Sequence, residues 1–149
     1  MVALGSTGPP GMKRVRAALA IAWALPCSLL GVAFGLLVLA LGGTCRREAR
    51  SLEFVRFAGA APASAWWQRL PFVAITLGHV VIAVNQAAMQ RLRQHEQVHV
   101  RQYERWGVLF FVAYPLASLW AGLRGQCPYR HNHFEVQACR AQPPEHHKV

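Results

Sequence analysis

The chain has 149 residues, enough for one compact domain or for a small domain with a membrane segment. Hydrophobic residues make up 54% and charged residues 15%, which excludes a disordered, solvating polymer. Lysines and arginines outnumber glutamates 16 to 6 and there is no aspartate, so chemistry that needs a carboxylate draws on a short list. The four cysteines have no regular spacing, which argues against a disulfide scaffold.

An uncharged apolar segment near the N-terminus predicts a membrane helix. A basic tail, residues 1–16, precedes residues 17–42, which carry no charge. As a helix this segment would be about 39 Å long, enough to cross a hydrocarbon core, and a bilayer-spanning helix tolerates Pro26. The run is long for a signal peptide, and Cys45 lacks the usual lipoprotein pattern before it. A transmembrane helix is therefore favoured over both, and over a buried core helix.

Flanking charges and tryptophans give the expected membrane placement. Three basic residues precede the apolar segment and four follow it by residue 56, so the positive-inside rule favours a cytoplasmic C-terminal part at the cytoplasmic membrane. Trp66, Trp67 and Arg69 resemble interfacial anchors at the lipid bilayer. The arginines are spread along the chain without a compact basic module, so no nucleic-acid partner is expected. The composition carries no signal for an oligomeric state.

Short strands are predicted after the membrane segment. Residues 51–57 alternate polar and apolar side chains, as a half-buried strand does. Residues 59–64 are small and indicate a linker. Residues 72–84 are apolar and β-branched around Gly78, which predicts either one kinked strand, buried or at an edge, or a tight hairpin.

Helices dominate the rest of the chain. Asn85 suits the N-cap of a helix over 86–106, which Gly107 ends. Residues 108–123 are uncharged and interrupted by Tyr114-Pro115, which predicts a buried or membrane-embedded helix, with a second transmembrane pass as the alternative. A turn at 127–130, a short helix at 133–141 and a disordered tail at 142–149 are expected to follow. The whole predicts an α+β fold, a transmembrane helix followed by a small domain over residues 51–141.

The most informative motif is His95-Glu96-Gln97-Val98-His99, which has the form H-E-x-x-H. Residues i and i+4 of a helix lie on one face, so His95 and His99 can direct two imidazole nitrogens at one zinc ion. Glu96 then lies beside the metal, where it can accept a proton from water. Since the motif lies on the inward side of an amphipathic helix, it has the structural context that this chemistry requires.

A third zinc ligand is sought among the remaining acids, because catalytic zinc sites usually have three protein ligands. A metzincin continuation would need glycine and histidine where this chain has Gln102 and Arg105. Of the other glutamates, Glu48 and Glu53 lie beside the membrane segment. Glu104 faces away on the same helix as the motif, and Glu145 is in the tail. Glu135, in the predicted last helix, remains, and it completes the His-His-Glu set of gluzincins.

At these residues the chain resembles the gluzincin-type zincin-like metallopeptidases. The relatives include small membrane-anchored bacterial proteins and zincin-like domains of unknown function associated with contractile injection systems. The match covers about residues 74–141 and consists of the strand 75–78, His95-Glu96-x-x-His99-x-x-Gln102 and Phe134-Glu135-x-x-Ala138. Many relatives carry a second acid where this chain has Gln137.

The resemblance implies that His95, His99 and Glu135 bind zinc and that Glu96 is the general base. The expected reaction is hydrolysis of a peptide or protein substrate, in which zinc lowers the pKa of its water toward about 7 and Glu96 takes the proton. The strand within 74–83 could pair with an extended substrate backbone. Four side chains are candidate donors to the oxyanion or substrate: His79, Tyr129, His131 and His133.

Other interpretations of the same residues stay open. A histidine such as His79 in an apolar strand is typically buried and hydrogen-bonded. Cys127, His131, His133 and Cys139 could form a structural zinc site, although their spacing is not a standard one. At the level of function, the alternative is an inactive zincin-like scaffold that binds zinc structurally or recruits a membrane partner. A further alternative is a basic peripheral adaptor that binds anionic lipid or nucleic acid and in which the H-E-x-x-H motif occurs by chance.

Overall fold

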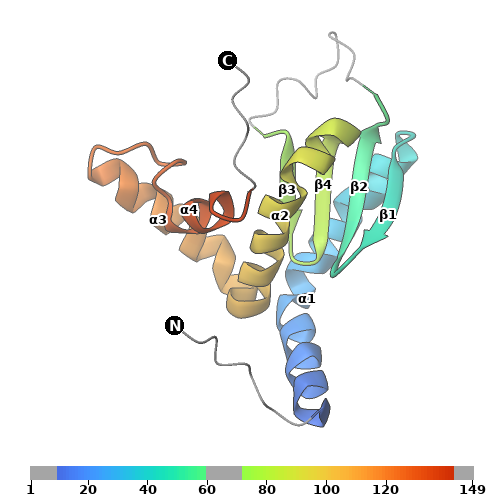
Figure 1. Ribbon diagram of the computed structural model, residues 1–149, viewed down its shortest axis with the longest axis horizontal. Helices are drawn as coiled ribbons and strands as arrows, with labels where there is room; N and C mark the ends of the chain where they lie inside the picture. Colours follow the sequence, from blue (N-terminus) through green and yellow to red (C-terminus); the bar gives the residue numbers. More distant parts are fainter. Residues whose placement is uncertain (1–9, 60–71, 143–149) are drawn as a thin grey trace.

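The computed structural model describes residues 10–59 and 72–142, which form a mixed α+β fold with a small sheet (Figure 1). In chain order the elements are α1 (Pro10–Ala40), β1 (Thr44–Glu48), β2 (Ser51–Phe57), β3 (Ala74–Leu77), β4 (Val80–Asn85), α2 (Gln86–Trp106), the short 3-10 helix η2 (Gly107–Leu109), α3 (Phe110–Leu123) and α4 (His133–Cys139). Some predictions lie outside the described residues: Trp66, Trp67, Arg69, most of the linker 59–64 and nearly all of the tail.

The sheet has the strand order β1-β2-β4-β3, which makes β3 an edge strand. Strands β2 and β4 are parallel, and the two outer pairs are antiparallel. Alternate side chains point to opposite faces, so Phe54 and Val80 pack against Val38 of α1, whereas Val55 and Val81 face α2. The sheet therefore lies between α1 and α2 (Figure 1).

Helix α1 is buried along one stripe only. Its buried residues recur every three or four positions, at Ala24, Cys27, Gly31, Gly35 and Val38, and contact the domain. The remaining apolar side chains are exposed, among them Leu19, Ile21, Trp23, Leu25, Leu29, Phe34, Leu36 and Leu37. By length and composition, two helical stretches could cross a membrane, Ala17–Ala40 and Gln86–Leu123. A helix apolar enough to span a membrane is thus present where it was predicted, and its stripe from Ala24 to Val38 also forms part of the domain core.

Most predicted strands are confirmed in position. Strand β2 has the predicted bounds, and the segment 72–84 is the hairpin β3–β4 rather than one kinked strand. Its turn is Gly78-His79, where Gly78 has φ +62°, a conformation that favours glycine. Strand β1, which the sequence analysis did not predict, pairs with β2 around a turn in which Ala49 also has a positive φ.

The predicted helices are confirmed, with one correction. Asn85 caps α2 by accepting a hydrogen bond from the Ala88 amide at 2.8 Å, and Gly107 ends it with φ +55°. The helix predicted over 108–123 is present as α3, which runs unbroken through Pro115. The last helix, α4, ends at Cys139 rather than at residue 141.

Candidate metal centre

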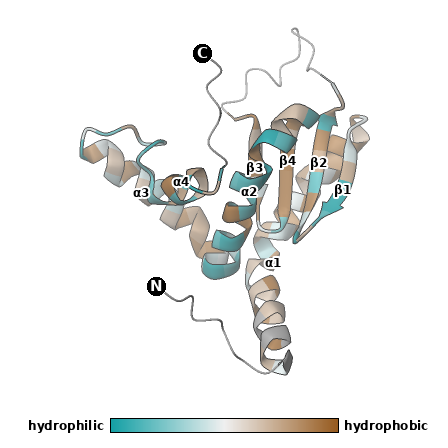
Figure 2. Cartoon of the chain, in the orientation of Figure 1, coloured by the Kyte–Doolittle hydropathy of each residue, from teal (hydrophilic) through white to brown (hydrophobic). Residues whose placement is uncertain are grey.

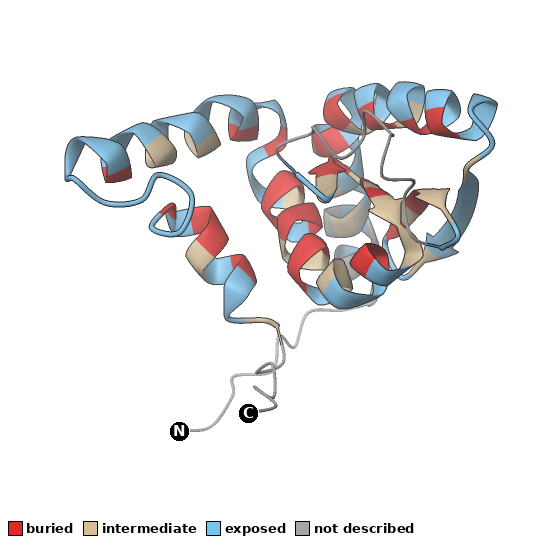
Figure 3. Ribbon diagram, turned by 90° about the horizontal axis from the view of Figure 1, so that it is seen from above, coloured by how far each residue is buried: buried red, intermediate tan, exposed pale blue. Residues whose placement is uncertain are grey.

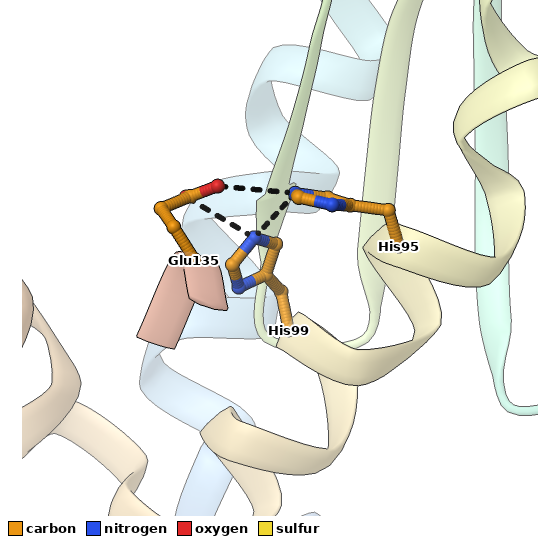
Figure 4. A group of neighbouring side chains, drawn as sticks. All are labelled: His95, His99 and Glu135. Carbon is orange, nitrogen blue, oxygen red and sulfur yellow. Dashed lines mark hydrogen bonds and ion pairs between the residues drawn. The ribbon is translucent and has the colours of Figure 1, made fainter. Parts of the chain in front are cut away.

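Three side chains from two helices converge at one point (Figure 4). His95 and His99 project from adjacent turns of α2, and Glu135 reaches toward them from the first turn of α4. One potential ligand atom from each residue lies within 4.8 Å of the others, and the side chains are buried. The convergence predicted from the motif and the distant glutamate is therefore present in the fold, and this group could hold a metal ion.

The spacing of the three ligands suits a small tetrahedral cation. The Nε2 atoms of His95 and His99 are 3.1 Å apart, and each lies 3.3–3.4 Å from a Glu135 oxygen. Tetrahedral zinc bonds of about 2.0–2.1 Å would separate neighbouring ligand atoms by about 3.3 Å. Glu135 Oε2 is buried and has no hydrogen-bond donor among the described residues. A cation at this point would satisfy that oxygen, so the residues fit zinc.

Gln102 orients one of the imidazoles. Its side-chain nitrogen donates to the Phe134 carbonyl and to Gln137 Oε1, both at 3.1 Å, which leaves its oxygen to face His99. That oxygen is 2.8 Å from His99 Nδ1, so Nδ1 carries the proton and donates. His99 Nε2 faces Glu135 and His95: when protonated it can donate to the carboxylate, and when a metal ion takes the place of that proton it offers its lone pair.

The same network ties α2 to α4. Gln102 donates to the carbonyl of Phe134, the residue directly before Glu135. Helix α2, which carries the two histidines, therefore also holds the N-terminal end of α4, which carries the carboxylate. Gln137 accepts from Gln102 and contacts His133. In the sequence, Gln102 was noted as a departure from the metzincin pattern and as part of the zincin-like match, but its side chain was given no role. Its spacing of three residues from His99 was the available signal.

Tyr114 of α3 and the cap of α4 position Glu135. Asn132 is fully buried and accepts a hydrogen bond from the Phe134 amide, which fixes the start of α4. The Tyr114 hydroxyl donates to Glu135 Oε1 at 2.6 Å. Burial raises the pKa of the Glu135 carboxyl, but its imidazole and hydroxyl neighbours outweigh burial and hold that pKa well below its ordinary range. Glu135 is therefore an anion, as a metal ligand must be.

Glu96 lies beside the three converging residues and is held by the edge strand. The Thr76 hydroxyl of β3 donates to Glu96 Oε2 at 2.7 Å. Only 5% of Glu96 is exposed, so this hydrogen bond is made away from bulk water. The carboxylate is thus fixed in one orientation at the wall of the cavity into which the histidines also point.

A cavity of about 560 Å³ opens onto the centre. Its polar groups include His95, Glu96, His99, Glu135 and Thr76. The rest of its wall is largely apolar and comes from β3, α2, α3 and the segment before β3: Phe72, Val73, Ile75, Leu77, Leu92, Phe110, Phe111 and Pro115. A cleft of this size is large enough for several side chains of a ligand.

Of the four candidate donors, only Tyr129 lines this cavity. Burial and the neighbouring Glu135 carboxylate raise the pKa of Tyr129, so it is a neutral hydroxyl that can donate a hydrogen bond. His79 is instead hydrogen-bonded to Ser28 of α1 and contacts Glu104 of α2, as a satisfied histidine does. His131 and His133 are exposed and are absent from the cavity wall.

The alternative zinc site of cysteines and histidines does not form among the described residues. Cys127 and Cys139 are exposed, free thiols, and the one group of three or more metal-binding side chains found in the described chain is His95, His99 and Glu135. Cys27 is a buried residue of the core, as its place in the apolar segment indicated.

Comparison of the chain with protein-family models, curated proteins and solved structures found no match. The argument for a function therefore rests on the site itself.

Proposed function

We propose that the chain is a membrane-associated, zinc-dependent peptidase of the gluzincin type. The observation that carries the proposal is the meeting of Glu135 with His95 and His99 at the floor of an open, largely apolar cavity. Helix α1, which is apolar enough to cross a membrane, supports the association with a bilayer. A cavity beside the ligands supports catalysis rather than a purely structural role, because catalytic zinc sites keep an open position.

The residues around the centre are suited to peptide hydrolysis. His95, His99 and Glu135 would hold the zinc, which when bound supplies Lewis acidity and a water of lowered pKa. Glu96 accepts a proton, and its hydrogen bond from Thr76 holds the accepting carboxylate in place. Tyr129 can donate a hydrogen bond to the oxygen of an attacked carbonyl.

Strand β3 can bind the backbone of a substrate. The Val84 amide donates to the Val73 carbonyl, so by alternation the backbone groups of Ile75 and Leu77 face β4 and those of Ala74 and Thr76 face the open edge. An extended peptide can pair with this edge, directly beside Glu96.

Metal analysis and a peptidase assay test the proposal. We expect near-stoichiometric zinc in the purified protein, lost in Glu135→Ala and His99→Ala and retained in the control Glu48→Ala, whose side chain contacts exposed Arg46. Glu96→Gln should retain zinc and lose hydrolysis of unfolded peptides. Unchanged zinc in Glu135→Ala would show that the ligand set is wrong.

An inactive scaffold that binds zinc structurally is the second candidate. Its support is the burial of the ligands: His95, His99 and Glu135 are only 5%, 7% and 3% exposed, as in closed structural sites. For such a scaffold, zinc-loaded wild-type protein would show no hydrolysis for Glu96→Gln to remove, and removal of zinc would lower thermal stability.

A further inference from the structure

Helix α3 has two apolar faces with different surroundings. One face contributes Phe110, Phe111, Tyr114 and Pro115 to the cavity wall. The other is apolar as well, yet it contacts no other part of the described chain closely: Val112, Leu116, Leu119, Trp120 and Leu123 are each 57–73% exposed. Figure 2 shows the helix mostly in pale to brown colours, without a strongly hydrophilic stretch, and Figure 3 shows it as largely exposed along its length. One helix therefore separates the cavity from an uncovered apolar surface.

The outward face of α3 has the character of a surface in contact with lipid. No charged residue lies between positions 108 and 123, and the helix ends at Arg124, whose guanidinium stacks 4.6 Å over the Trp120 ring. A tryptophan beside an arginine is typical of the membrane–water interface. Gly107, in the 3-10 helix directly before α3, packs closely against Trp23 of α1, which is itself 47% exposed. Helix α3 belongs to the second of the two stretches that are apolar enough to cross a membrane.

The cavity on the inner side of α3 selects against charged side chains. The chain has 16 lysines and arginines, yet none of them lines the cavity among the described residues. Of its two carboxylates, Glu96 accepts from Thr76, and Glu135 accepts from Tyr114 through Oε1 and directs Oε2 at His95, where the proposed zinc would bind. A charged substrate side chain would lose its hydration here without gaining a partner, whereas large apolar side chains would be buried against the wall.

We propose that the substrates are apolar segments of membrane-inserted polypeptides, which reach the cavity from the bilayer that covers the outer face of α3. This inference rests on the proposed function and names its substrate class. Phe72 and Val73, which are 38% and 48% exposed at the start of the cavity wall, extend the apolar surface along the segment that leads into β3.

A binding experiment tests the substrate class without requiring turnover. Full-length, zinc-loaded Glu96→Gln protein in detergent is titrated with two fluorescent peptides of equal length, one rich in leucine and valine, the other with serine and glutamine at those positions. We expect about tenfold tighter binding of the apolar peptide for each large side chain buried. Equal affinities would overturn the proposal.

Two substitutions in α3 localise the binding. Phe111→Ser should remove the preference, because Phe111 lines the cavity, whereas Leu119→Ser should retain it, because Leu119 lies on the outward face. A preference that survives Phe111→Ser would overturn the assignment to this cavity. If the wild type cleaves neither peptide while the variant binds the apolar one, the peptidase proposal fails and the binding site stands. Preferred cleavage of the polar peptide overturns the substrate class alone.

Vesicles test the route from the membrane. Glu96→Gln protein with a photo-crosslinker in place of Phe111 is reconstituted into phosphatidylethanolamine and phosphatidylglycerol vesicles with a single-span polypeptide that has an apolar segment beside its span. We expect crosslinks when both share a vesicle and none when they are in separate vesicles; crosslinks from separate vesicles would overturn the route. A stable dimer that Leu119→Glu dissociates would show that a second copy of the chain covers the outer face of α3. This result would also overturn the route from the bilayer.

Discussion

Thr76 donates a hydrogen bond of 2.7 Å to the carboxylate of Glu96, which joins the edge strand of the sheet to the motif helix. The two residues are twenty positions apart, and the contact exists because the hairpin β3–β4 places β3 against α2. A carboxylate turned away from Thr76 would lose this hydrogen bond in a buried setting, where an unpaired polar group is costly. The strand therefore positions the group that is proposed to accept the proton.

Replacing Thr76 tests this positioning role. Thr76→Val keeps the shape of the side chain and removes the donor, so we expect kcat/KM for peptide hydrolysis to fall roughly tenfold while zinc content is unchanged. Thr76→Ser restores a hydroxyl and should restore most of the activity. Assays with metal analysis on the same samples measure both quantities, and full activity in Thr76→Val would contradict the role.

Gln102 is expected to govern metal affinity rather than chemistry. Gln102→Ala removes the acceptor that fixes the His99 tautomer and the link to Phe134, so zinc affinity should fall by about 10–100-fold. Gln97→Ala is the matched control, because Gln97 lies on the same helix and contacts Ser51 instead. Competition against a chelator of known affinity measures the difference. Equal affinities for the two variants would show that Gln102 has no part in the centre.

Local rules were sufficient to predict much of this fold. Asn85 and Gly107 bound α2 as capping preferences dictate, and the i, i+4 spacing placed His95 and His99 on one face. Glu135 followed from the scarcity of acids in this chain. Each of these inferences depends on short-range geometry or on composition, which a single sequence contains.

Long-range contacts account for what the sequence did not predict. Tyr114 reaches Glu135 across 21 positions and Thr76 reaches Glu96 across 20, and no periodicity marks either pair. The stretch 17–42 was interpreted as an anchor because it has no charges, but its small residues Gly31 and Gly35 pack on the sheet. Strand β1 was missed since Arg46 and Arg47 give it no apolar alternation.

The ion pair between Glu53 and Arg93 is expected to be essential for stability. Arg93 binds both oxygens of Glu53 at 2.8 and 2.9 Å, and the Glu53 side chain is only 3% exposed. Arg93→Met leaves a buried carboxylate without its partner and should cost about 3–5 kcal/mol in the free energy of unfolding. Glu53→Gln should cost less, because the Arg93 guanidinium is partly exposed and can reach water.

A surface pair provides the control for that measurement. Arg46 and Glu48 are 3.4 Å apart and largely exposed, so Arg46→Met should change stability by less than about 1 kcal/mol. Denaturant unfolding in detergent, followed by circular dichroism, compares the three variants. Similar decreases in the free energy of unfolding for Arg46→Met and Arg93→Met would show that the Glu53–Arg93 pair stabilises the fold no more than a surface pair does.

Gly31 tests whether α1 is part of the domain or only an anchor. A Cβ atom at Gly31 would lie 2.7 Å from Val80 Cβ and 2.8 Å from the Leu77 carbonyl oxygen, and the latter is backbone that cannot move cheaply. Gly31→Ala should therefore destabilise the domain by about 1–3 kcal/mol, although alanine is the better helix former. Gly11→Ala is the matched control, since nothing described lies within 4 Å of its Cβ position, and it should not lower stability. If α1 served only as a lipid-facing anchor, both substitutions would leave the unfolding of the sheet and the zinc centre unchanged. A loss confined to Gly31→Ala would instead show that helix α1 and the site share one cooperative core.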